Sequence, residues 1–404
     1  MKVLISGASV AGPVLAYWLS RYGFTVTVVE RSPTLRKTGG HAVDLFRPAM
    51  EIVERMGVLE RISARSTGTQ SLVAYRDGDP RPVELKMPDV AGAVSDRHVE
   101  IMRDDLSEIF YEATRHDVEY VFGDSIASIS DDGEVVFDGG REERFDLVAG
   151  ADGLHSNVRR LVFGPESGFT TWIGAYLAVA SVPNHLGLDR RLEAVRAAGR
   201  LAGVYSAAHM DDARALFLFK TPAELDYHHR DIPRQKEILR EQFAHLGWEV
   251  PRLLDEAERS PAFYFDSITQ LRLDSWSRGR VTLVGDAGYS PGPALGGGTS
   301  LAVVGAYVLA GELAAHGGDH TRALPAYEAE IGDYVRRSRA FAVDMAAKLV
   351  PDTPFALWGM TQALRLISRL PTGLATAAMK FGTRSASVHH SFPVKDYSAF
   401  AKAG

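Results

Sequence analysis

Short apolar runs separated by a helical pattern open the chain. Residues 2–6 (KVLIS) and 25–29 (TVTVV) are rich in β-branched side chains, which predicts two buried strands. Residues 11–22 between them have the spacing of a helix, and Gly23 follows as its C-terminal cap. A strand, a glycine turn, a helix and a second strand form a βαβ unit. Such a unit implies a parallel sheet.

The pattern changes between about Thr170 and Leu273. Four segments there predict strands of an antiparallel sheet, with a helix over 234–246 among them: 171–182, 200–209, 213–220 and 262–273. The α/β pattern returns with a strand at 280–286 and a helix at 299–315. We therefore predict an α/β fold with an α+β insert, in which a Rossmann-like domain carries an inserted, mostly antiparallel sheet and is followed by C-terminal helices.

The predicted domain boundaries follow these changes of pattern. A discontinuous dinucleotide-binding domain is expected over 1–70, 93–170 and 274–324. A substrate domain is expected over 71–92 and 171–273, and a helical segment over 325–404.

Composition and charge exclude several classes of function. Of the 404 residues 46% are apolar and 24% charged, which is typical of a globular protein. A net charge of -6 without a basic tract gives no reason to expect nucleic acid. The chain has no cysteine, so disulfides and thiolate metal sites are excluded, and its histidines lack metal-ligand spacing. The longest uncharged stretch near the C-terminus, 354–364, is too short for an integral membrane span. We expect a cytoplasmic protein that binds no metal, and leave its oligomeric state open.

The first glycine motif, GASVAG over 7–12, follows a predicted strand and opens a helix. Gly7 permits the tight turn, Gly12 allows helix and strand to pack closely, and Ser9 replaces the usual middle glycine. The helix N-terminus offers N–H groups to a diphosphate, and Glu30 ends the second strand, where a carboxylate binds ribose. The alternative is a turn that binds nothing, and this motif cannot separate FAD from NAD. The predicted cofactor contacts here are Gly7, Ser9, Val10, Ala11, Gly12, Glu30 and Arg31.

A second glycine-rich segment follows the strand at 280–286. Asp286 lies at the carboxyl end of that strand, where parallel sheets bind ligands, and can accept hydrogen bonds from sugar-like hydroxyls. Gly296, Gly297 and Gly298 then lead into a helix, whose N-terminus would stabilise negative charge on a reduced flavin. The alternatives are an aspartate that caps a turn and a flexible glycine loop.

Together with the segment DLVAGADGLHSNVR at 146–159, these motifs resemble those of the FAD-dependent aromatic hydroxylases, the family that includes p-hydroxybenzoate hydroxylase and the tetracycline-inactivating monooxygenases. The resemblance covers residues 1 to roughly 340. It implies that Asp152 helps to seat FAD and the nicotinamide cofactor, and that Asp286 binds the ribityl chain of FAD. It also implies that Arg36 contacts the nicotinamide cofactor. Further FAD contacts are implied at Asp44, Arg103, Gly285, Pro293 and Thr299.

One position departs from the family pattern. Many relatives have Ala-His after Gly-Asp-Ala, whereas this chain has Gly288-Tyr289. Whatever that histidine contributes is absent, and Tyr289 is expected to pack beside the diphosphate.

The resemblance implies an FAD-dependent monooxygenase. NADPH or NADH would reduce FAD, O2 would form a flavin C4a-hydroperoxide, and this would oxygenate an aromatic or polycyclic small molecule. The protein would have to keep water away from that intermediate. Aromatic residues of the middle segment are candidates for the pocket wall, although ordinary core packing is the favoured explanation for them: Tyr176, Tyr205, Phe217, Phe219, Phe263 and Phe265. His41 is the first candidate for an acid or base. The alternatives are a related reductase or oxidase without oxygen insertion, and a non-catalytic FAD-binding protein.

Overall fold

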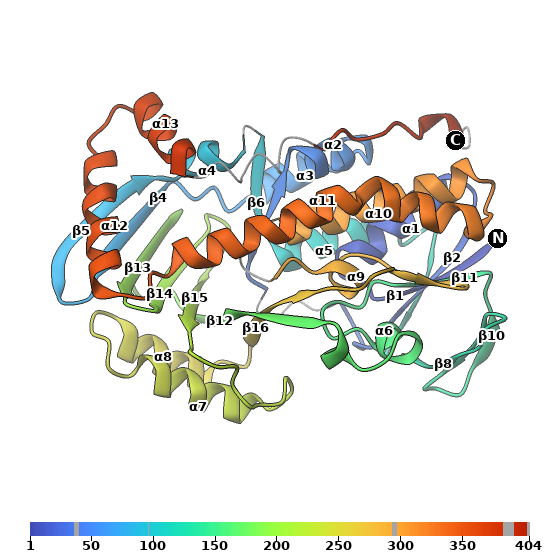
Figure 1. The fold of residues 1–404 in the computed structure, drawn as a ribbon, viewed down its shortest axis with the longest axis horizontal. Coiled ribbons are helices and arrows are strands. Elements are labelled where there is room, and N and C mark those ends of the chain that lie inside the picture. The colour runs from blue at the N-terminus through green and yellow to red at the C-terminus, as the bar shows by residue number, and fades with distance from the viewer. Residues whose placement is uncertain (36–39, 96, 293–296, 383–391, 402–404) are drawn as a thin grey trace.

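A computed structural model describes residues 1–35, 40–95, 97–292, 297–382 and 392–401 of the chain. Two sheets organise it, one at each end of an elongated molecule (Figure 1). The first sheet has the strand order β17-β18-β11-β1-β2-β7. Neighbouring strands run parallel in every pair except β17 with β18, which is antiparallel. Its strands are β1 (Lys2–Ser6), β2 (Thr25–Glu30), β7 (Glu119–Phe122), β11 (Leu147–Gly150), β17 (Ser277–Arg278) and β18 (Val281–Leu283).

Helices and two small sheets surround the first sheet. A three-stranded antiparallel sheet of β8, β9 and β10 lies beside it, and β3 pairs with β6 in an antiparallel ribbon. These elements are α1 (Ala11–Arg21), β3 (Ala42–Phe46), α2 (Arg47–Arg55), α3 (Leu59–Ala64), β6 (His98–Met102), α5 (Arg103–Glu112), β8 (Ile126–Ile129), β9 (Glu134–Phe137), β10 (Glu142–Arg144), α6 (Asn157–Val162), η1 (Glu166–Gly168), α9 (Asp286–Tyr289) and α10 (Gly298–Ala315).

The second sheet has the order β16-β12-β15-β14-β13-β4-β5, and every pair is antiparallel except β13 with β4. One of its faces packs against α7 and α8, and the other packs against the end of α11. Its elements are β4 (Ser71–Arg76), β5 (Asp79–Lys86), β12 (Thr170–Pro183), β13 (Arg191–Ala197), β14 (Arg200–Ser206), β15 (Asp212–Lys220), α7 (Ile232–Phe243), α8 (Val250–Arg259) and β16 (Phe263–Leu271).

The C-terminal helices join the two ends of the molecule. Helix α11 runs along its length, and α12 and α13 then cover the outer edge of the second sheet beside α4 (Figure 1). The remaining elements are α4 (Met87–Val94), α11 (His320–Leu349), α12 (Pro354–Ile367), α13 (Thr372–Gly382) and η3 (Ser398–Phe400).

The predicted fold class is therefore confirmed, and the predicted elements lie close to their expected bounds. The pattern did not predict strand β13 or helix α8. Strand β13 has the sequence RLEAVRA, whose charged residues resemble an exposed loop more than a buried strand.

Helix α10 has apolar residues on all sides. By length and composition alone it could cross a membrane, but 78% of it is buried within the protein. It packs between α1 and α11 in the largest hydrophobic core, which joins the first sheet to its helices. Its composition is therefore that of a central core helix, and its first residues are held rigidly at the edge of the sheet.

Candidate functional site

A cavity of about 410 Å³ lies at the carboxyl edge of the first sheet, where the loops after its strands meet the start of β16 from the second sheet. Most of the predicted cofactor residues line it: Gly7, Ser9, Val10, Ala11, Glu30, Arg31, Asp44, Arg103, Asp152, Asp286, Gly297, Gly298 and Thr299. Gly12 and Gly285 belong to the helix and the turn beside the cavity. Arg36, Pro293 and Gly296 lie outside the described residues.

The first glycine turn is held by close backbone contacts. Gly7 has a φ of 110°, and its N–H donates to the carbonyl of Val29 at 2.8 Å. A Cβ on Gly12 would lie 1.9 Å from the carbonyl oxygen of Gly7, so only glycine allows α1 to start this close to β1. Helix α1 begins without a side-chain cap and without an acidic residue in its first turn. Its free N–H groups and partial positive charge therefore face the cavity.

Glu30 lies at the end of β2 and lines the cavity. Its carboxylate accepts hydrogen bonds from the N–H of Ala8 at 3.0 Å and of Ser32 at 2.9 Å. These bonds orient the carboxylate and fix the glycine turn to β2. Because a carboxylate has about four acceptor sites, Glu30 retains capacity for the hydroxyls of a ribose.

Asp286 and Arg103 bring opposite charges to the middle of the cavity. Asp286 starts α9 and is partly buried at the cavity wall. Desolvation there raises the pKa of its carboxyl, while the positive charge of Arg103 opposes this shift. Arg103 starts α5, and its Nη2 donates to the Oγ of Ser9 at 3.3 Å. The guanidinium therefore lies between the first glycine turn and the Gly285-Asp286 turn, two segments far apart in the sequence.

A second helix N-terminus faces the same cavity. Helix α10 follows Gly297, which has a φ of 93°, and it too starts without a side-chain cap or an acidic first turn. The Oγ of Ser300 donates to the carbonyl of Asp44 at 3.1 Å and accepts from the N–H of Phe46 at 2.9 Å. The start of α10 is thereby fixed to β3, which carries Asp44 into the cavity.

Asp44 and Asp152 line the cavity, but their carboxyls also have structural partners. Asp44 Oδ1 lies 2.6 Å from Nε2 of His98 on the neighbouring strand. Burial acts to lower the pKa of His98, but the hydrogen bond and charge of Asp44 outweigh it, so this pKa lies above its ordinary value. Asp152 accepts from the hydroxyl of Ser156 and the N–H of Val158 at 3.1 Å. Its carboxyl thus fixes the start of α6.

His41 and Tyr264 face each other where the two sheets meet. Their ring centroids are 5.6 Å apart, and both residues line the cavity. Burial, assisted by the positive charge of Arg103, lowers the pKa of His41 to about 4, so its imidazole is neutral near pH 7. Burial raises the pKa of Tyr264 well above 10, so its hydroxyl keeps its proton. The cavity wall therefore presents a neutral imidazole and a phenol.

A chain of polar groups leads from Tyr264 toward the surface. Its hydroxyl lies 3.4 Å from Oδ2 of Asp266, which lies 3.3 Å from Nε2 of His155. Nδ1 of His155 lies 2.9 Å from Oε1 of Glu166, which is partly exposed. Burial acts to lower the pKa of His155, but the hydrogen bonds of Asp266 and Glu166 raise it to about 9.

Sequence reasoning did not identify Tyr264, Asp266 or the role of His155. A signal existed for His155, since it lies within the segment at 146–159 that the family resemblance singled out. For Tyr264 and Asp266 the alternation in β16 shows only that they share one face of the strand.

The residues predicted to form a substrate wall lie in two places. Tyr176, Phe217 and Phe219 pack in the core between the second sheet and α7 and α8, and none of them lines the cavity. Tyr205 points toward the first domain, where its hydroxyl accepts from the N–H of Ala42 at 2.9 Å. Phe263 lines the cavity and also packs against the core that contains Tyr176, and Phe265 belongs to that core.

Tyr289 also differs from its expected position beside the diphosphate. It is fully buried, with its ring 4.6 Å from that of Trp276, and its hydroxyl accepts from that of Tyr327 at 2.9 Å. The hydroxyl lies against the backbone of Gly305 in α10. The side chain that replaces the usual histidine therefore joins α9 to α10 and α11 and does not line the cavity.

These groups fit FAD. Two uncapped helix N-termini and Arg103 match a diphosphate and an electron-rich ring, and the carboxyls of Glu30 and Asp286 match ribose and ribityl hydroxyls. The cavity volume also falls within the range of about 300–1,000 Å³ usual for ligand sites.

Comparisons with known proteins agree with this fit. Residues 1–342 match the model of a family described as an FAD binding domain. A flavin-dependent monooxygenase of Legionella longbeachae is 39% identical over 85% of this chain and 88% of its own length. An uncharacterised protein of Mycobacterium tuberculosis is 45% identical over 85% of this chain and 92% of its own.

Solved structures extend the likeness to the C-terminal helices. The structure of tetracycline destructase Tet(55) is 34% identical, with a TM-score of 0.82 over 98% of both chains. The structure of HpxO of Klebsiella pneumoniae, complexed with FAD and uric acid, has a TM-score of 0.73 over 95% of this chain and 97% of its own. At 21% identity it supports the fold alone.

Proposed function

This chain belongs to the FAD-binding-domain family of flavin-dependent monooxygenases, and from that premise we propose that it oxygenates a polycyclic aromatic compound of the tetracycline kind. The observation that carries the proposal is the meeting of three motif segments and a wall from the second sheet at one cavity. The substrate class is supported by the likeness to tetracycline destructase Tet(55) over 98% of both chains.

The cofactor would be held by residues from separate segments. The N-termini of α1 and α10 would stabilise the diphosphate and the flavin ring, and Glu30 and Asp286 would accept from the ribose and ribityl hydroxyls. Arg103 would add a positive charge between them. FAD bound there would supply the redox chemistry, passing electrons from NADPH or NADH to O2 so that one oxygen atom of O2 can enter the product.

Tyr264, Asp266 and His155 would move protons at the cavity wall. The hydroxyl of Tyr264 donates to Asp266, so its oxygen can accept the proton of a substrate hydroxyl while its own proton passes to Asp266, and His155 connects Asp266 to Glu166 at the surface. The neutral imidazole of His41, in ring contact with Tyr264, can accept a hydrogen bond beside it. Such groups adjust the protonation of a phenolic substrate without admitting bulk water.

We assign FAD binding to the segments 1–70, 93–170 and 274–324, and substrate binding to 71–92 and 171–273, with the helices over 325–404 holding the two together. Nothing in this scheme requires export, and we propose that the enzyme acts in the cytoplasm.

The test begins with the purified full chain and its bound FAD. Tetracycline and related polycyclic phenols are added one at a time while NADPH and NADH oxidation is followed, and products formed under ¹⁸O2 are analysed by mass spectrometry. The expected result is faster NAD(P)H oxidation and a product carrying one ¹⁸O atom. A product without ¹⁸O would favour the reductase or oxidase alternative, and a flavin that no NAD(P)H reduces would favour a non-catalytic protein.

Replacing Tyr264 tests the proposed proton chain. Tyr264→Phe should lower kcat by about 10²-fold, the lower end of the usual effect of an acid or base, and change its pH profile. FAD binding should be unchanged. Tyr334→Phe is the matched control, because Tyr334 is buried and its hydroxyl has no hydrogen-bond partner among the described residues. Equal pH profiles for the wild type and Tyr264→Phe would contradict the assignment.

A further inference from the structure

Helices α12 and α13 expose a row of large apolar side chains at the end of the molecule opposite both termini (Figure 1). Within this row Phe355 is 81% exposed, Leu366 65% and Leu374 60%. The row, which we call the α12–α13 apolar row, consists of Phe355, Trp358, Leu366, Leu370 and Leu374. It holds five of the nine large apolar side chains that are exposed over the described residues. Such clustering marks an interaction surface.

The apolar row is the outer face of a helix that is already packed on its other side. Positions 355, 358 and 366 recur on one side of the helical period of α12, and Leu370 follows in the turn before α13. Leu357 and Thr361 are buried on the opposite side, against the second sheet. Nη2 of Arg365 donates to Asp79 at 2.9 Å and anchors the helix there. The exposed row is therefore not needed to hold α12 on the protein.

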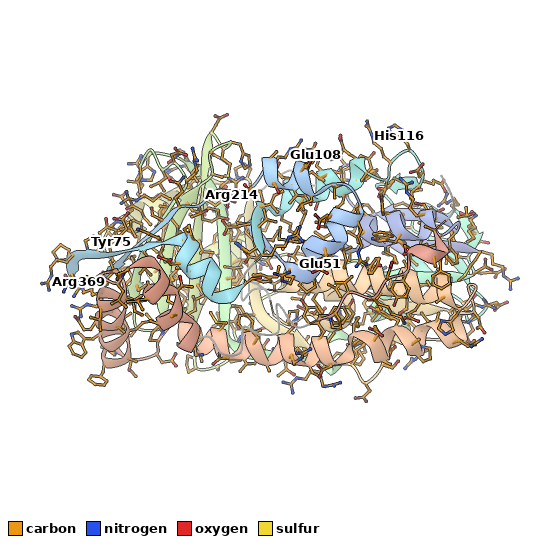
Figure 2. The ribbon with its side chains drawn as sticks, turned by 90° about the horizontal axis from the view of Figure 1, so that it is seen from above. Glu51, Tyr75, Glu108, His116, Arg214 and Arg369 are labelled. Carbon is orange, nitrogen blue, oxygen red and sulfur yellow. The ribbon has the colours of Figure 1, made fainter. Side chains whose placement is uncertain are left out.

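The charge of this segment is one-sided. The stretch 354–382 contains Arg365, Arg369 and Lys380 and no acidic residue, in a chain whose net charge is -6. Arg369 is exposed and lies at the same end of the molecule (Figure 2). The side chain of Arg81 on β5 is 78% exposed and, with Arg365, shares Asp79 as its single acidic partner in the described part of the chain. An apolar row with aromatic residues and a basic border is complementary to an anionic, partly apolar surface.

A second copy of this chain fits the surface less well than a bilayer. A twofold contact through the α12–α13 apolar row would bring the basic borders of both copies together without an acidic partner in the segment. A membrane surface has the opposite charge, and phenyl and indole rings favour its interface.

We propose that the α12–α13 apolar row binds the surface of an anionic lipid bilayer. The Phe355 and Trp358 rings, stacked at 6.2 Å, would enter the boundary between headgroups and acyl chains. Arg369 would contact lipid phosphates. This mode of binding leaves the cavity at the junction of the two sheets free, and it brings the enzyme to apolar compounds dissolved in a membrane.

The FAD-loaded full chain is tested by co-sedimentation with vesicles of phosphatidylcholine containing phosphatidylglycerol, and with vesicles of phosphatidylcholine alone. We expect binding to the anionic vesicles, weaker binding to the neutral ones, and a blue shift of tryptophan emission that Trp358→Leu removes. Phe355→Ser/Leu366→Ser should weaken binding by at least tenfold, because two exposed apolar side chains are lost. Arg369→Glu should weaken only the binding to anionic vesicles, by about tenfold.

Two substitutions elsewhere serve as matched controls. Ile232→Ser removes an apolar side chain that is 46% exposed on α7, and Arg115→Glu reverses an exposed charge after α5. Both should bind vesicles as the wild type does, and all variants should keep the wild-type rate of NADPH oxidation without lipid. The proposal is overturned if the wild type stays in solution with anionic vesicles, or if the double variant binds them equally well. It is also overturned if the wild type forms a dimer that the double variant abolishes.

Discussion

The contact of Gly12 with Gly7 allows a quantitative test of the cofactor site. A Cβ at position 12 would lie 1.9 Å from the carbonyl oxygen of Gly7, where real contacts stay above 3.0 Å. Gly12→Ala therefore forces the start of α1 and the glycine turn apart by roughly 1 Å, a shift too large for a packed interior to absorb without cost. Hydrogen bonds need donor–acceptor distances of about 2.7–3.2 Å, so N–H groups displaced this far no longer reach a diphosphate.

Losing one or two bonds to a charged group costs about 1.5–3 kcal/mol each. We therefore expect Gly12→Ala to raise the Kd for FAD at least tenfold, since about 1.4 kcal/mol corresponds to a factor of ten. The assay is a titration of apoprotein with FAD, followed by the quenching of flavin fluorescence. Gly332→Ala is the matched control, because a Cβ there, on α11, would meet its nearest neighbour at 3.6 Å.

The outcome separates two explanations of this glycine. If Gly12→Ala binds FAD within twofold of the wild type, the turn does not position the diphosphate and the reasoning fails. A variant that unfolds at a lower temperature without FAD, but recovers its stability only at high FAD concentration, would agree with it.

Two further substitutions test other parts of the structure. The pKa of His155 is about 9 in the folded protein and ordinarily 6.5, so the stability it contributes is complete below pH 6.5 and is lost as the pH rises through 9. Thermal unfolding from pH 6 to 10 should show this loss in the wild type and a flatter profile in His155→Gln, and parallel profiles would contradict it. Gly305→Ala would place a Cβ 1.9 Å from the hydroxyl oxygen of Tyr289. We therefore expect it to lower the free energy of unfolding by about 1–3 kcal/mol. The loss should be smaller in the Tyr289→Phe background, which lacks that hydroxyl. Denaturant unfolding of the four proteins measures this coupling, and equal losses in both backgrounds would refute the contact.

The sequence predicted most of the fold because local patterns were strong. The glycine turn after β1, the Gly285-Asp286 turn and the start of α10 each follow a buried strand or open a helix, and the structure brings them to one cavity. Among the elements that the pattern did not predict, β13 and α8 are short and carry several charges. Their burial comes from neighbours elsewhere in the chain, and local pattern contains no information about those neighbours.

The aromatic residues predicted to form the substrate wall show what a local sequence pattern cannot predict. Alternation along a strand assigns residues to two faces but does not tell which face meets a cofactor. Tyr176, Phe217 and Phe219 turned out to face α7 and α8.

The sequence alone determined the parallel sheet, a dinucleotide site and the segments that approach the diphosphate, because each depends on residues adjacent in the chain. The choice of FAD came from the resemblance of three separated motifs to one family. Tertiary structure decided what those segments face. Asp266 and His155 are 111 positions apart and are joined only where β16 approaches the loop between β11 and α6. The contact of Tyr289 with Gly305 likewise depends on two helices packing together. Side chains so distant in sequence interact only after the sheets have packed, and their chemistry is a property of that packing.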